Sequence, residues 1–182
     1  MTLGRLILRL LVGGLFVGHG LQKLRGSFGG AGLEQTGEFF ESLGLRPGRR
    51  HALAAGTAET AGGAMLALGL ATPLAVATLI AVMSTAVRKV HLQNGIWVSE
   101  GGFEYNAVLI AALTLLAETG PGRLSLDAAF GIEKRGVRWG LAALTGGAIA
   151  SATTIKLSQG DPSGGLDAEG SNESPEAVAR AT

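Results

Sequence analysis

Four long apolar runs, separated by polar or turn-forming segments, occupy the first two thirds of the chain. They cover residues 6–24, 52–70, 73–92 and 103–118. An α-helix rises 1.5 Å per residue, so about 20 residues cross the roughly 30 Å hydrocarbon core of a bilayer. Thr72 and Pro73 allow only a tight turn between the second and third runs, which makes them antiparallel neighbours. The pattern predicts an all-α, polytopic transmembrane helix bundle with four core helices.

The first run also has some features of a secretory signal peptide, because Arg5 and Arg9 lie at its start. It lacks a clear small-residue cleavage site, and further apolar runs follow it, so we interpret it as a membrane span. The polar connection 25–51 carries Leu33, Thr36 and Phe40 at helical spacing. A short amphipathic helix at the membrane interface is expected there.

The C-terminal third is less apolar. Residues 137–155 form a Gly/Ala-rich stretch that we interpret as a fifth span, with an interfacial helix as the alternative. From Lys156 onwards, acidic residues lie among Ser, Gly, Pro and Ala, a composition typical of disorder. The predicted organisation is a four-helix membrane domain at 1–131, an additional transmembrane or interfacial helix at 132–155, and a disordered acidic tail at 156–182.

Composition narrows the function classes. Apolar residues make up 47% of the chain and charged residues 16%, and the 30 glycines suit close packing of helices in lipid. The net charge of +1 and the absence of a basic stripe argue against nucleic acid as a partner. Cysteine is absent, which excludes disulfides and dithiol chemistry within this chain. In any redox reaction, a cofactor or a partner subunit would have to carry the electrons.

The ionisable residues of the four runs fall in one half of the predicted bundle. Tracking depth along antiparallel helices brings together six candidate ligand-binding or proton-relay residues, leaving the opposite half nearly free of charge: His19, Lys23, Glu59, Arg88, His91 and Glu104. Arg88 and His91 share a helix face, whereas Lys89 falls on another and is expected to reach the headgroups. A carboxylate as deep as Glu59 costs several kcal/mol unless it is paired or protonated.

Several interpretations of this cluster stay open. Each residue near a helix end could be an interfacial anchor, and the whole cluster could be a structural lock between helices. Two histidines at similar depth also suit haem ligation, but nothing turns them toward each other. The cluster lacks a short-range metal-ligand motif, and its cations would repel a metal ion, so no metal is expected. The mixed charge best suits a hydrogen-bonding headgroup such as that of a quinone or a membrane lipid.

Two glycines, Gly56 and Gly63, lie on the same helix face as Glu59. They leave room beside the carboxylate for either a neighbouring helix or a ligand.

Six short motifs occur in order along residues 1–131. They are 18–24 (GHGLQKL), 40–45 (FESLGL), 58–63 (AETAGG), 68–73 (LGLATP), 100–105 (EGGFEY) and 120–127 (GPGRLSLD). On these motifs the chain resembles the DoxX family of small bacterial membrane proteins. The resemblance implies a four-helix multi-pass protein of the cell inner (cytoplasmic) membrane, and it directs attention to Lys23, Glu59, Glu104 and Asp127. Asp127 also fits an ordinary structural role as a cap on a short helix at 126–130.

Members of the family have been tied to thiosulfate:quinone oxidoreductase, terminal oxidase and redox-stress assemblies. The resemblance therefore implies a quinone-interacting subunit or membrane component of a redox system, with quinone as the candidate cofactor and a soluble or membrane redox subunit as partner. A non-enzymatic scaffold that docks a partner enzyme is the alternative, and a small-solute transporter is a third. Whether this chain is itself an enzyme is left open.

Overall fold

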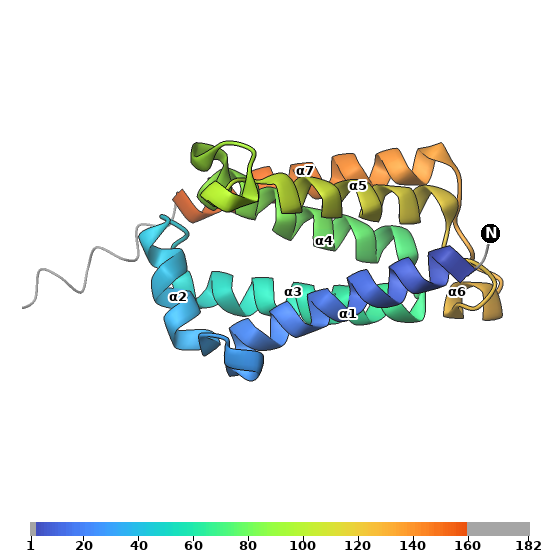
Figure 1. Ribbon diagram of the computed structural model, residues 1–182, viewed down its shortest axis with the longest axis horizontal. Helices are drawn as coiled ribbons and strands as arrows, with labels where there is room; N and C mark the ends of the chain where they lie inside the picture. Colours follow the sequence, from blue (N-terminus) through green and yellow to red (C-terminus); the bar gives the residue numbers. More distant parts are fainter. Residues whose placement is uncertain (1–2, 160–182) are drawn as a thin grey trace, which may run out of the picture.

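The computed structural model describes residues 3–159, which contain seven α-helices and no strand. Five long helices form the bundle: α1 (Leu3–Arg25), α3 (Gly48–Leu68), α4 (Thr72–Ala86), α5 (Glu104–Thr119) and α7 (Val137–Gln159). Two short helices, α2 (Gly32–Ser42) and α6 (Leu126–Ala129), lie at opposite ends of it (Figure 1). The all-α prediction is confirmed for this part of the chain.

The long helices form two groups. α1 packs along α3, while α4, α5 and α7 pack against one another on the other side (Figure 1). The groups meet mainly through α3 and α4. An apolar core at this junction contains Phe16 and Leu66 from the first group and Leu79, Ile80 and Leu113 from the second, all of them buried.

Two segments are long and apolar enough to cross a membrane by length and composition. They are Leu3–Arg25 and Thr72–Asn94. The second consists of α4 together with a π-helical segment, Val87–His91, and a short 3-10 turn, Leu92–Asn94. Both segments coincide with runs that the hydrophobic pattern predicted.

Four glycines allow the backbones of α1 and α3 to touch. A methyl group at Gly63 would lie 2.6 Å from the backbone oxygen of Gly13, and one at Gly20 would lie 2.6 Å from that of Gly56. Their positions fit two antiparallel helices. From the Gly13–Gly63 contact to the Gly20–Gly56 contact, α1 advances by seven residues while α3 goes back by seven. Helix α1 therefore occupies the space beside Gly56 and Gly63.

Helix α7 lies alongside α4 and α5 (Figure 1). Its Ser151 is fully buried, and the hydroxyl lies 3.0 Å from the Thr85 hydroxyl of α4, which donates to it. The helix ends at Gln159, beyond the predicted start of the tail, because buried Ser158 still packs against the bundle and its hydroxyl donates to the Ile155 carbonyl. The rest of the predicted acidic tail, 160–182, lies outside the described residues.

The half of the bundle predicted to be nearly free of charge contains a buried arginine. Arg9 is 2% exposed, and its guanidinium donates hydrogen bonds to the carbonyls of Ala67, Pro121 and Leu124. The prediction was wrong because Arg9 was treated as a flanking charge. Since α1 begins at Leu3, Arg9 lies within the helix, and carbonyls at the end of α3 and in the loop after α5 satisfy its donors.

Asp127 lies in the same end of the bundle, and it does not cap its own helix as predicted. Ser125 caps α6 by accepting a hydrogen bond from the Ala128 amide. Asp127 is 1% exposed and accepts from the Ala71 amide at 2.7 Å, the Thr72 amide at 3.0 Å and the Thr72 hydroxyl at 2.8 Å. These amides begin α4, so Asp127 caps a helix distant in sequence, where a negative charge is favourable.

Candidate functional site

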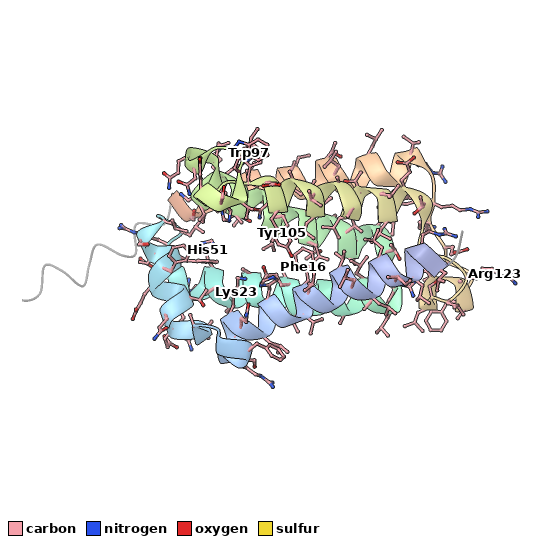
Figure 2. The ribbon with its side chains drawn as sticks, viewed as in Figure 1. Phe16, Lys23, His51, Trp97, Tyr105 and Arg123 are labelled. Atoms are coloured by element: carbon pink, nitrogen blue, oxygen red, sulfur yellow. The ribbon has the colours of Figure 1, made fainter. Side chains whose placement is uncertain are left out.

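A largely apolar cavity of about 710 Å³ lies toward the end of the bundle that carries α2. Its walls come from α1 and α3 on one side and from α4, α5 and α7 on the other, and Phe39 and Phe40 of α2 contribute at the end. Lys23 and His51 lie toward this end, and Arg123 lies at the opposite one (Figure 2). The cavity therefore lies within the half of the bundle where the sequence placed the candidate cluster.

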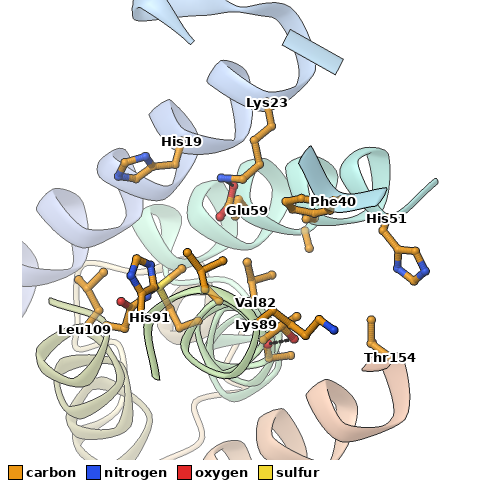
Figure 3. Close-up of a pocket in the computed structure, with 18 of the residues that line it drawn as sticks. His19, Lys23, Phe40, His51, Glu59, Val82, Lys89, His91, Leu109 and Thr154 are labelled. Atoms are coloured by element: carbon orange, nitrogen blue, oxygen red, sulfur yellow. Dashed lines mark hydrogen bonds and ion pairs between the residues drawn. The ribbon is translucent and has the colours of Figure 1, made fainter. Parts of the chain in front are cut away.

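Lys23 and Glu59 form an ion pair in the cavity wall, with Lys23 Nζ 2.7 Å from Glu59 Oε2 (Figure 3). Helical side chains lean toward the N-terminus of their own helix. Lys23, in the last turn of α1, therefore leans back into the bundle. Glu59 leans toward the start of α3 and meets it there. The result is a paired charge inside the bundle instead of a lysine directed to the interface.

The Glu59 carboxylate is not fully satisfied by this pair. Its side chain is 2% exposed, against 25% for Lys23. Within residues 3–159, no group besides the Lys23 ammonium contacts Oε2 as a donor. An ionised carboxylate has about four acceptor positions. Glu59 therefore retains the capacity to accept a proton or a hydrogen bond from a group in the cavity.

All three histidines of the chain line the cavity: His19, His51 and His91. The Nδ1 atom of His91 lies 2.7 Å from the Gly101 carbonyl, and Nε2 of His51 lies 3.2 Å from the Arg46 carbonyl. A carbonyl oxygen only accepts, so each of these nitrogens carries the hydrogen. In the neutral ring, the other nitrogen is then an acceptor. Nδ1 of His19 lies 3.0 Å from Gln22 Oε1.

Not every predicted residue reaches the cavity. His19, Lys23, Glu59 and His91 line it, whereas Arg88, in the π-helical segment after α4, is exposed and is not part of the lining. Glu104 lies at the start of α5 and accepts a hydrogen bond from the Val98 amide at 3.1 Å, within the preceding loop.

Lys89 lines the cavity, in contrast to the predicted position at the headgroups. It follows Thr85 by one turn and Val82 by two, and both of these residues also line the cavity. The prediction had used the spacing between Arg88 and His91 without the register of the rest of α4. The π-helical segment also widens this turn, so Lys89, Val90 and His91 all contribute to the wall.

His51 and Asn106 also line the cavity and were not among the candidates. His51 was assigned to a polar connection, but α3 already begins at Gly48, directly after Pro47, a common helix-start signal that could have placed it correctly. Asn106 is 5% exposed in the first turn of α5, and Nδ2 contacts only the Met83 sulfur, at 3.5 Å. An amide within an apolar run was the available signal for it. Among residues 3–159, no three His, Asp or Glu side chains are grouped as metal ligands.

Comparisons with known proteins identify relatives of this chain. The family model DoxX matches residues 4–92, which include Lys23, Glu59 and His91. A Bacillus subtilis (strain 168) protein named "Putative oxidoreductase CatD" is 32% identical over 125 residues, covering 69% of this chain and 85% of that protein. No solved structure matches the chain. The chain therefore belongs to the DoxX family of membrane proteins, and it is a distant homologue of the Bacillus protein.

Proposed function

We propose that this protein is a membrane subunit of a redox system and that it binds a quinone in the cavity beside Glu59. The observation that carries the proposal is a buried carboxylate with unused hydrogen-bonding capacity, paired with an ammonium group, in the wall of an otherwise apolar cavity. The volume of about 710 Å³ falls within the usual range for small-molecule sites, roughly 300–1,000 Å³. Apolar walls with few polar groups suit a quinone ring and part of its tail.

The proposal includes the arrangement in the membrane. The helices α1, α3, α4 and α5 would cross the cell inner membrane as the four-helix core, and α7 would be the fifth span. Leu15 and His19 of α1 and Tyr105 of α5 line the cavity and are also exposed on the side of the bundle. A lipophilic ligand enters between α1 and α5 directly from the bilayer in this arrangement.

Reduction of a quinone to a quinol takes up two electrons and two protons. The chain has no cysteine, so the electrons come from a redox-active partner subunit in this proposal, and the two protons come from water, with Glu59 as a relay. The Lys23 ammonium donates a hydrogen bond to one quinone oxygen, and the Glu59 carboxylate accepts one from the quinol hydroxyl. The oxidoreductase name of the Bacillus relative is consistent with a role in electron transfer.

The proposal predicts that Glu59→Gln removes quinone binding without removing the folded protein. Glutamine preserves the size of the side chain but carries no charge and cannot pass a proton to the quinone. We expect the quinone content of the purified protein to fall about tenfold, the size of one charge-assisted hydrogen bond. The measurement is extraction and chromatography of bound quinone after gentle detergent purification. The matched control is Glu38→Gln, an exposed carboxylate of α2 outside the cavity lining.

A scaffold function is the second candidate, because the same ion pair also joins α1 to α3. On that interpretation, the wild-type protein contains no quinone, and Glu59→Gln lowers the amount of folded protein in membranes. Wild-type protein without quinone, isolated together with its partner subunits, would rule out the quinone proposal.

A further inference from the structure

The cavity wall opposite the Lys23–Glu59 pair carries a second polar group, formed by His91 and Asn106, which we call the distal pair. Both residues line the cavity. In Figure 3, His19, Lys23 and Glu59 lie on one side of the cavity, while His91 lies on the other with Val82 and Leu109. The polar groups of this apolar cavity are therefore divided between two facing walls.

Asn106 is buried without adequate partners. The side chain is 5% exposed, and its Nδ2 donates to the Met83 sulfur at 3.5 Å. A thioether is a weak acceptor, whereas a primary amide offers two donors and a carbonyl. Leaving such a group unsatisfied within an apolar wall costs about 1–3 kcal/mol. A buried amide that borders a cavity therefore indicates a polar ligand atom beside it.

His91 is held in a defined orientation. Its Nδ1 donates to the Gly101 carbonyl, so Nε2 of the neutral ring is an acceptor. The loop that supplies this carbonyl is tied to the start of α5, because the Glu104 amide donates to the Ile96 carbonyl at 2.8 Å and Glu104 Oε2 accepts from the Val98 amide. The π-helical segment carries His91 to the same wall. Such segments occur often at functional sites.

We propose that the ligand of this cavity is a ring with oxygen atoms on two opposite sides, a para-quinone or para-hydroquinone, held at one oxygen by Lys23 and Glu59 and at the other by the distal pair. Asn106 Nδ2 donates to a quinone carbonyl, and His91 Nε2 accepts from a hydroquinone hydroxyl. The inference rests on the proposed function and adds the class of ligand and two specificity-determining residues. A lipid with a single oxygen-bearing end would leave Asn106 unsatisfied.

The test compares two ligands that differ by one oxygen. A decyl-substituted 1,4-hydroquinone and the decylphenol lacking one hydroxyl are titrated calorimetrically, without oxygen, into the full-length protein in detergent, with empty micelles as the blank. We expect wild-type protein to bind the hydroquinone about tenfold more tightly than the phenol, the size of one buried hydrogen bond. Because the two residues share this preference, Asn106→Leu and His91→Phe should each reduce it about threefold and leave phenol binding unchanged.

Thr114→Val is the matched control. Thr114 is also on α5, but its hydroxyl donates to the Ile110 carbonyl of its own helix and it does not line this cavity. Equal wild-type affinity for the two ligands, or an unchanged preference in both folded variants, would contradict the role of the distal pair in binding the second oxygen. Either result would leave the proposed quinone site at Glu59 intact. Failure of wild-type protein to bind either ligand would overturn the proposed function as well. Two variants are included so that a misfolded Asn106→Leu protein does not decide the result.

Discussion

Gly63→Ala is expected to lower the free energy of unfolding by about 3 kcal/mol, the upper part of the usual range for overpacking a close contact. The added methyl group would lie 2.6 Å from the Gly13 oxygen, 2.9 Å from the Phe16 Cβ and 2.9 Å from the Val17 amide nitrogen. Two of these atoms belong to the α1 backbone, so no side-chain rotation relieves the contact. The helices must separate, which removes the close packing on which association in lipid depends.

The measurement is thermal unfolding in detergent, followed by the fraction of protein that remains monodisperse. For a chain of this size, about 3 kcal/mol corresponds to a fall of about 10 °C in the unfolding midpoint. Gly14→Ala is the control, because nothing lies within 4 Å of a methyl group there. Alanine favours helix over glycine, so the control should be neutral or slightly stabilising. Equal midpoints for the two variants would contradict the close α1–α3 contact.

Much of the fold could be predicted from local signals in the sequence. Apolar runs and turn residues are read directly from neighbouring positions, and each helix boundary depends on them. Gly120–Pro121–Gly122 predicted the end of the fourth run, and α5 ends at Thr119. Thr72–Pro73 predicted the tight turn at the start of α4. The sequence also predicted that Glu59 is paired or protonated, because an unpaired carboxylate deep in an apolar run is costly on any face of the helix.

The contacts between distant segments could not be predicted in the same way. The partners of Arg9 are carbonyls of Ala67, Pro121 and Leu124, and a backbone carbonyl has no sequence signal. The π-helical turn, which brings Lys89, Val90 and His91 together in the cavity wall, is not specified by any residue pattern. The candidate residues therefore included Arg88 and Glu104, which the structure places outside the cavity lining, and omitted His51 and Asn106. The functional roles of all of them stay predictions.

Asp127→Ala is expected to destabilise the protein by about 4 kcal/mol, although the residue lies far from the cavity. The substitution leaves the Ala71 and Thr72 amides and the Thr72 hydroxyl without their acceptor. Each unsatisfied buried donor costs about 1–3 kcal/mol. It also removes the negative charge from the N-terminus of α4 and from the neighbourhood of Arg9, on which Asp127 acts electrostatically. The expected readout is loss of folded protein from membranes and a lower unfolding midpoint.

Arg9→Met tests whether the two residues act as one unit. Both fix the 120–127 segment, Arg9 through its Pro121 and Leu124 carbonyls and Asp127 through its attachment to α4. Once either residue is replaced, the 120–127 segment is already less ordered, so removing the second contact costs less. The double variant should therefore lose about 1–2 kcal/mol less than the sum of the single variants. Strict additivity would show two independent contacts. Folded protein recovered from any of the variants should still bind quinone with wild-type affinity, since α6 lies at the opposite end of the bundle from α2, which borders the cavity (Figure 1).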